Sequence, residues 1–70
     1  MHYLILRITL ENGQYGHRIL WRGSHNDCKR EAWFTNIEDF RGPGIVKAEL
    51  IVIDKDAWSK IKAVQVGRRG

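Results

Sequence analysis

The residues of this chain that could do chemistry are few, and the most suggestive spacing is that of His25 and Cys28. Three residues apart, the two side chains would share one face of a helix, where they could contribute to a metal site. A structural zinc ion needs four ligands and a catalytic one needs three, so His2 and His17 would have to be recruited from elsewhere. We therefore expect no metal and no other cofactor.

Cys28 is also the candidate nucleophile, because a thiol near the start of a helix can have a lowered pKa. It lies, however, on an apolar stripe with Ala32, which is typical of a small buried side chain. The sequence contains no Gly-x-Ser-x-Gly, P-loop or dinucleotide-binding pattern. We predict that the protein is not an enzyme.

The elements that position these residues begin with a β-hairpin around Asn12-Gly13. Asn-Gly between two apolar runs predicts a two-residue type I′ turn, in which both residues have positive φ. Pairing outward from that turn places Leu4 opposite Trp21, and alternation then divides the hairpin into two faces. The expected core face consists of Leu4, Leu6, Ile8, Leu10, Tyr15, His17, Ile19 and Trp21. The expected outer face consists of Tyr3, Ile5, Arg7, Thr9, Arg18, Leu20 and Arg22.

The expected outer face gathers arginine side chains. Arg7 and Arg18 are predicted to be directly opposed, and like charges in a cross-strand pair destabilise a sheet unless an acid or a bound anion relieves them. Arg22 beside Tyr3 would extend the strip through a cation–π contact. Glu49, on the third strand, is the acid that could neutralise the strip from within the chain.

A helical segment follows the hairpin. Ser24 with Asp27 resembles a capping box and predicts a helix start, and Gly42 before Pro43 predicts a left-handed cap at its end. The residues expected on the buried side of this segment are Cys28, Ala32, Trp33, Ile37 and Phe40. The stretch 35–38 is itself a second capping box, so two short helices are an alternative to one.

A third strand, residues 45–53, and a final helix complete the chain. Asp54 predicts the helix start, and the expected apolar face of that helix consists of Ala57, Trp58, Ile61 and Val64. Residues 62–66 are also compatible with a short fourth strand. We predict an α+β fold with a three-stranded antiparallel sheet in the order 2-1-3 and the main helix on its Leu4 face. Residues 1–66 would form one domain, followed by a mobile basic tail at residues 67–70.

The 70 residues carry a net charge of +4, and its distribution is uneven. Residues 1–56 balance acids and bases, whereas the remainder holds only bases. A basic segment of this kind favours anionic partners. The single cysteine suggests a reducing compartment, and the N-terminal apolar run ends at Arg7, too early for a signal peptide or a membrane span. We expect a cytoplasmic protein, in the host cytoplasm if the chain is viral.

These features favour a small non-enzymatic protein that occupies a surface of a macromolecular partner. In size and layout the chain resembles small phage-type accessory proteins and inhibitors, a likeness that rests on no motif and transfers no residue roles. The partner would be a protein with an acidic or nucleic-acid-handling surface, and direct binding of DNA or RNA is the alternative. Homodimerisation through an edge strand remains open. The expected partner-binding residues are Tyr3, Arg7, Arg18, Arg22, Trp58, Lys60, Lys62, Arg68 and Arg69.

The three tryptophans are assigned different roles. Trp21 and Trp33 are expected in the core. Trp58 is either a partly exposed anchor for a partner or the side chain that closes the core beneath Ile51 and Ile53.

Overall fold

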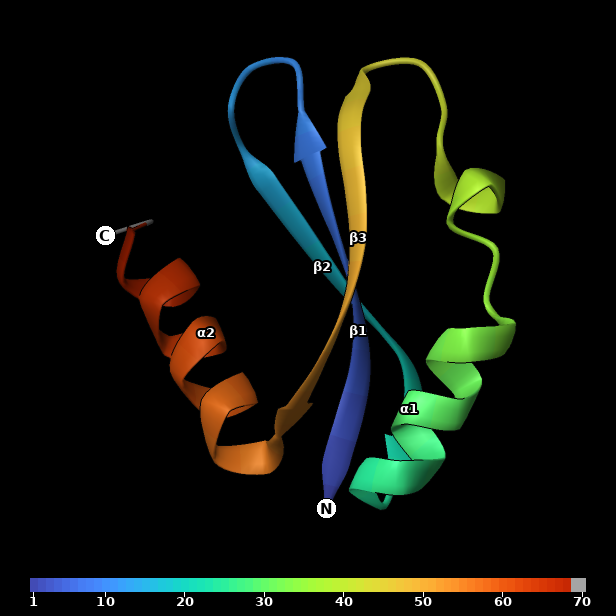
Figure 1. The fold of residues 1–70 in the computed structure, drawn as a ribbon. Coiled ribbons are helices and arrows are strands. Elements are labelled where there is room, and N and C mark those ends of the chain that lie inside the picture. Colours follow the sequence, from blue (N-terminus) through green and yellow to red (C-terminus); the bar gives the residue numbers. More distant parts are fainter. Residues whose placement is uncertain (69–70) are drawn as a thin grey trace.

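The computed structural model describes the backbone of residues 1–68 and the side chains of residues 1–61. Its three strands form one antiparallel sheet in the order β2-β1-β3 (Figure 1), which confirms the predicted α+β fold. The elements in chain order are β1 (His2–Leu10), β2 (Tyr15–Gly23), α1 (His25–Phe34), the 3-10 helix η1 (Ile37–Phe40), β3 (Ile45–Asp54) and α2 (Lys55–Arg68).

Both α-helices begin at the residues that the sequence indicates. The Ser24 hydroxyl accepts a hydrogen bond from the Asp27 N–H at 3.1 Å, and Asp54 Oδ1 accepts one from the Ala57 N–H at 2.7 Å. Each bond satisfies a donor that would otherwise lack a partner at the helix start. α2 continues through Arg68, so the alternative of a fourth strand at residues 62–66 is wrong, and the first two residues of the expected tail are helical. Residues 69–70 of that tail lie outside the described part of the chain.

The segment after α1 follows the alternative of two short helices. α1 ends at Phe34, and η1 begins after Asn36, whose side chain accepts a hydrogen bond from the Glu38 N–H at 3.1 Å. The predicted left-handed cap at Gly42 is wrong, because the positive φ in this region, +85°, belongs to Gly44. Pro43 and Gly44 are the central residues of a turn that ends on β3, and a glycine with positive φ after proline is typical of type II.

The hairpin loop has three residues instead of the predicted two. Gly13 has a φ of +85°, whereas Asn12 does not have positive φ. The Leu10 N–H donates to the Gln14 carbonyl at 2.8 Å, and the Gly13 N–H donates to the Leu10 carbonyl at 2.9 Å. This is a turn followed by a left-handed glycine, the common three-residue hairpin loop. The extra loop residue moves every neighbouring pair by one position, so the predicted pairing next to the turn is wrong.

A bulge in β2 then reverses the shift. Between Leu4 and Ile5 the ladder passes over Leu20, and beyond it Leu4 lies opposite Trp21 and Tyr3 opposite Arg22, as predicted. From Ile5 to Thr9 the strand β1 is instead paired one residue earlier on β2. An extra residue in a strand reverses which face its neighbours occupy.

The corrected register exchanges side chains between the two faces of the sheet. The face that α1 covers, here called the α1 face, carries Leu4, Leu6, Ile8, Arg18 and Trp21. The face beside α2, here called the α2 face, carries Tyr3, Ile5, Arg7, Tyr15, His17 and Ile19. The predicted core face is therefore wrong at Tyr15, His17 and Ile19, and the predicted outer face is wrong at Arg18.

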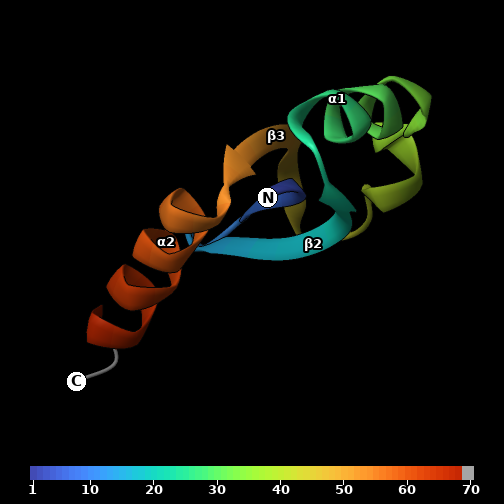
Figure 2. The ribbon, with the colours of Figure 1, turned by 90° about the horizontal axis from the view of Figure 1, so that it is seen from below.

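Both faces of the sheet contribute to the core. Leu4, Leu6 and Ala48 are buried on the α1 face against the fully buried Cys28, and Ile5 is fully buried on the α2 face, which was expected to be the outer one. The helices lie on opposite sides of the sheet, so the molecule is a plate with α1, sheet and α2 side by side (Figures 1 and 2). In its thinnest direction the plate measures 10 Å. Neighbouring strands lie ~4.8 Å apart, so this thickness is about the distance between the two outer strands of a three-stranded sheet.

Candidate partner-binding surfaces

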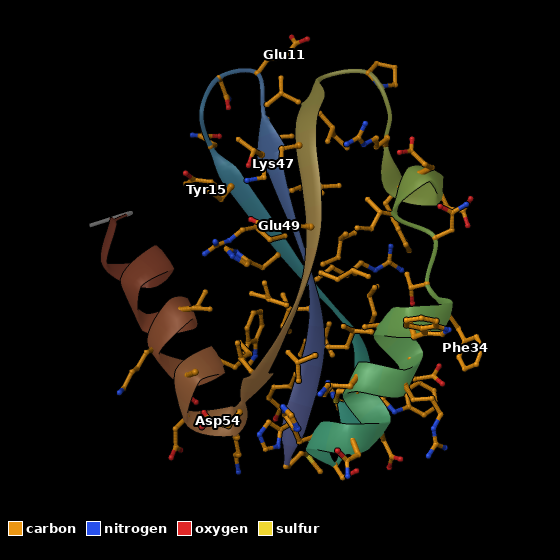
Figure 3. The ribbon with its side chains drawn as sticks, viewed as in Figure 1. Glu11, Tyr15, Phe34, Lys47, Glu49 and Asp54 are labelled. Carbon is orange, nitrogen blue, oxygen red and sulfur yellow. The ribbon has the colours of Figure 1, made fainter. Side chains whose placement is uncertain are left out.

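The side of α1 that faces away from the sheet carries the most exposed aromatic residues of the described chain. Trp33 is 84% exposed and the adjacent Phe34 is 73% exposed. In Figure 3 the Phe34 side chain is directed away from the sheet and from the rest of the molecule. Lys29 and Arg30, one turn before Trp33, are exposed as well. These four residues form the surface that we call the α1 stripe.

Helix geometry explains why the α1 stripe is exposed. Cys28 is fully buried and Ala32 is half-buried, so their side of the helix faces the sheet. At about 100° per residue, Trp33 lies about 140° around the helix from Cys28. The prediction that Trp33 belongs to the core is therefore wrong, although its spacing from Cys28 was a signal in the sequence. Trp21, 45% exposed at the rim of the α1 face, is also not a core residue as predicted.

Cys28 lies in surroundings that oppose its ionisation. Burial raises the pKa of its thiol, and the neighbouring Asp27 carboxylate raises it further. His25 instead contacts the ring of His2, with the ring centroids 5.1 Å apart. No group of three or more metal-ligating side chains converges among the described residues.

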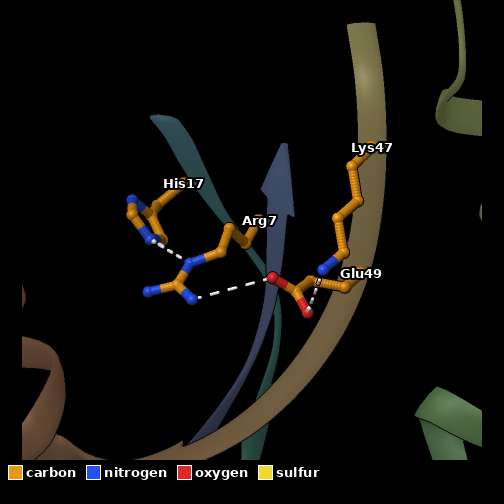
Figure 4. Close-up of polar contacts among 4 residues, drawn as sticks. All are labelled: Arg7, His17, Lys47 and Glu49. Atoms are coloured by element: carbon orange, nitrogen blue, oxygen red, sulfur yellow. Dashed lines mark hydrogen bonds and ion pairs between the residues drawn. The ribbon is translucent and has the colours of Figure 1, made fainter. Parts of the chain in front are cut away.

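A polar cluster occupies the open part of the α2 face (Figure 4). Arg7 Nε donates to His17 Nε2 at 3.2 Å, an Arg7 Nη lies 3.6 Å from a Glu49 carboxylate oxygen, and the guanidinium lies over the Tyr15 ring at 5.4 Å. Lys47 Nζ approaches the other Glu49 oxygen at 4.0 Å. Burial lowers the pKa of His17, and the charge of Arg7 lowers it further. His17 accepts the Arg7 hydrogen bond and is therefore neutral in this arrangement.

The structure does not contain the predicted arginine strip. Arg7 pairs with His17 on the α2 face, whereas Arg18 lies opposite Leu6 on the α1 face. Glu49 forms an ion pair with Arg7, which confirms the prediction that an acid on the third strand could neutralise this arginine. Arg18 instead borders a groove of about 290 Å³ on the α1 face. The other residues that line this groove are Leu6, Ile8, Gly16, His17, Phe40 and Ile45.

The remaining candidate residues fall in two places. The predicted contact of Arg22 with Tyr3 is present, at 5.9 Å from guanidinium to ring centre. Trp58 is half-buried and packs edge-on against Tyr3 at 6.4 Å and His17 at 6.3 Å, so it joins α2 to the sheet. Lys60 is exposed on α2. The side chains of Lys62, Arg68 and Arg69 lie outside the described part of the chain.

Sequence reasoning missed two surface aromatics, Phe34 on the α1 stripe and Tyr15 on the α2 face. Tyr15 is 56% exposed and shares its face with Arg7 and Tyr3 because of the three-residue loop.

Comparisons with protein-family models, with curated proteins and with solved structures gave no match. Within residues 1–68, no helix has both the length and the apolar character that crossing a membrane requires.

Proposed function

We propose that this is a non-enzymatic binding protein that inserts the α1 stripe into a pocket on a protein partner. The observation that carries the proposal is the exposure of two adjacent large aromatic side chains, Trp33 at 84% and Phe34 at 73%. Exposed apolar surface of this kind marks interaction sites, and tryptophan and arginine are enriched among the residues that contribute most to binding. The helix that presents them packs against the sheet on its other side, where Cys28 is fully buried.

The charge of the α1 stripe supports a partner with an acidic surface. Lys29 and Arg30 are exposed one helical turn from Trp33. A complementary surface would surround an apolar pocket with carboxylates, and such charges increase the association rate and select the partner. This chemistry fits the acidic surface of a protein, including one that handles nucleic acids. An inhibitor or accessory protein of the phage type would act by covering that surface.

Replacing Trp33 tests the proposal. A photoreactive benzophenone residue in place of Phe34 would be used to crosslink and identify the partner in nuclease-treated lysate. Affinity for the purified partner would then be measured by calorimetry. We expect Trp33→Ala to weaken binding more than tenfold, because a central tryptophan contributes about 2 kcal/mol or more. Tyr15→Ala, which removes an exposed aromatic from the opposite side of the sheet, is the matched control. Equal affinities of Trp33→Ala and the wild-type chain would refute the proposal.

Direct binding of single-stranded nucleic acid is the second candidate, and the position of Tyr15 favours it. The α2 face presents Tyr15 and Tyr3, each with a guanidinium against its ring, and the exposed Lys47. Aromatic residues beside basic ones on a sheet are typical of surfaces that stack unpaired bases. Titration of a labelled oligonucleotide at increasing salt tests this function, with an expected log–log slope of about −0.7 for each phosphate contacted. Here Tyr15→Ala should weaken binding and Trp33→Ala should not.

A further inference from the structure

We infer that β3 pairs with β3 of a second copy of this chain, so that two sheets join into one. β3 is an edge strand, bonded to β1 on one side only. In Figure 2 the edges formed by β3 and β2 lie on the two long sides of the plate, with the helices at its ends. The 10 Å thickness of the plate is about that of three strands, so neither helix lies across the β3 edge.

The hydrogen bonding of the sheet shows which backbone groups of β3 point outward. The Lys55 N–H donates to the Met1 carbonyl at 3.1 Å, which places odd-numbered residues of β3 in hydrogen-bonded pairs with β1. The N–H and C=O groups of Ala48, Leu50 and Val52 therefore point away from β1. Among the backbone groups of residues 1–68 and the side chains of residues 1–61, none outside the sheet bonds to them. An edge of this kind is a template for another strand.

The charges on β3 select one register for a two-fold symmetric pair. Centring the antiparallel pair on Lys47 or Glu49 would place like charges directly opposite each other. Centring it on Leu50 would place both charged residues opposite isoleucines. Centring it on Ala48 places Lys47 of each copy opposite Glu49 of the other, which gives two favourable cross-strand pairs. In this register Ala48 of the two copies form a hydrogen-bonded pair, in agreement with the outward direction of their backbone groups.

The β2 edge is less suited to self-association. It contains the bulge at Leu20, and its charged residues, Arg18 and Arg22, are both positive. Bulges and like charges are features that protect edge strands from pairing. Self-pairing of β2 would bring arginines of two copies together with no acid on the strand to relieve them. The observations therefore favour β3.

The inferred pairing also covers apolar surface on β3. Val46, 61% exposed, is one of the apolar side chains that the inferred pairing covers, since it falls opposite Leu50 of the second copy.

The inferred dimer has a continuous sheet of six strands with both α1 helices on the same side of it, because the two-fold axis is perpendicular to the sheet. The α1 stripe points away from the sheet and stays exposed in this assembly. The dimer is therefore independent of the proposed function, and substitutions on β3 test it without altering Trp33.

Charge reversal on β3 tests the inference by sedimentation equilibrium. Lys47→Glu brings carboxylates together at both pairs of the interface, and Glu49→Lys brings ammonium groups together. We expect the wild-type chain to reach twice its mass of 8.2 kDa with rising concentration and each variant to dimerise at least tenfold more weakly. An equimolar mixture of the two variants restores both opposite-charge pairs, so we expect it to form heterodimers. Recovery in the mixture separates lost pairing from lost folding.

Arg18→Glu, a charge reversal on the β2 edge, is the control and should leave the dimer unchanged. Circular dichroism of Glu49→Lys checks that loss of its contact with Arg7 does not unfold the chain. A wild-type chain that remains at 8.2 kDa throughout would overturn the inference. Variants that dimerise as strongly as the wild type, or a mixture that shows no heterodimer, would do the same.

Discussion

His17 is held neutral by the residues around it. Its Nε2 accepts a hydrogen bond from Arg7, and its ring contacts Trp58 at the start of α2. Burial and the nearby guanidinium both disfavour an imidazolium, which lowers its pKa. One residue thus links the charge state of the α2 face to the packing of α2 against the sheet.

Stability should therefore decrease in mild acid. In the unfolded chain His17 takes up a proton near pH 6.5, whereas in the folded chain it does so only at the lower pKa. Between these two values the unfolded state binds more protons, so the free energy of unfolding falls as the pH falls below about 6.5. Urea denaturation at a series of pH values measures this slope.

His17→Gln is the variant that isolates the effect, because its amide oxygen can still accept from Arg7 but does not titrate. We expect it to reduce the slope between neutral pH and the lowered pKa. His25→Gln, which removes an exposed imidazole, is the matched control. An unchanged slope in His17→Gln would show that another group dominates the acid response.

At the scale of the element, the hairpin depends on one additional residue in its loop and one in β2. The three-residue loop moves His17 opposite Arg7, and the bulge at Leu20 returns Trp21 to its place opposite Leu4. Asn-Gly is compatible with both loop lengths, because each requires a left-handed glycine. The choice between them depends on which side chains each pairing buries, and here the half-buried Ile19 joins the fully buried Ile5 on the α2 face.

Gly13→Ala should destabilise the hairpin by about 1 kcal/mol, because an L-residue at positive φ is strained. A Cβ at this position would meet no atom within 4 Å, so the cost arises from the backbone alone. Gly42→Ala is the matched control: it too has open space around the new Cβ, but Gly42 does not have positive φ. We expect Gly42→Ala to be neutral or slightly stabilising. Equal midpoints of thermal unfolding for the two variants would contradict this account of the loop.

At the scale of the whole molecule, the thin plate limits the size of the core. The fully or largely buried apolar residues of the described chain are few, namely Leu4, Ile5, Leu6, Cys28 and Ala48. A chain of this length buries only about 60% of its unfolded surface, so its stability is marginal. Association with a second copy would add the missing apolar contacts.

The midpoint of thermal unfolding should consequently rise with protein concentration, because association stabilises the folded state by mass action. Calorimetry of the wild-type chain over a hundredfold range of concentration measures the shift. Lys47→Glu should lose most of the concentration dependence while remaining folded. A wild-type midpoint that is independent of concentration would contradict the expected coupling of association to stability.

Patterns local in the sequence predicted most of the fold. The caps Ser24 and Asp54 each satisfy a helix start within three residues, and the apolar run before Asn12-Gly13 identified β1 as a strand, although alternation did not predict the burial of Ile5 on the α2 face. The order β2-β1-β3 followed from the handedness of the connection through α1. The candidate site was predicted less well, because it depended on a register that one residue can reverse.

The sequence by itself determined the elements and their order, because these depend on neighbours along the chain. It also determined the contact between Tyr3 and Arg22, because this pair lies beyond the bulge, where the predicted register holds. Only the tertiary structure decided that Arg7 and Arg18 lie on opposite faces and that Trp33 lies in solvent. The physical reason is that a loop residue and a bulge cost little locally, so the packing of the two sheet faces against α1 and α2 selects between registers that the local sequence permits equally.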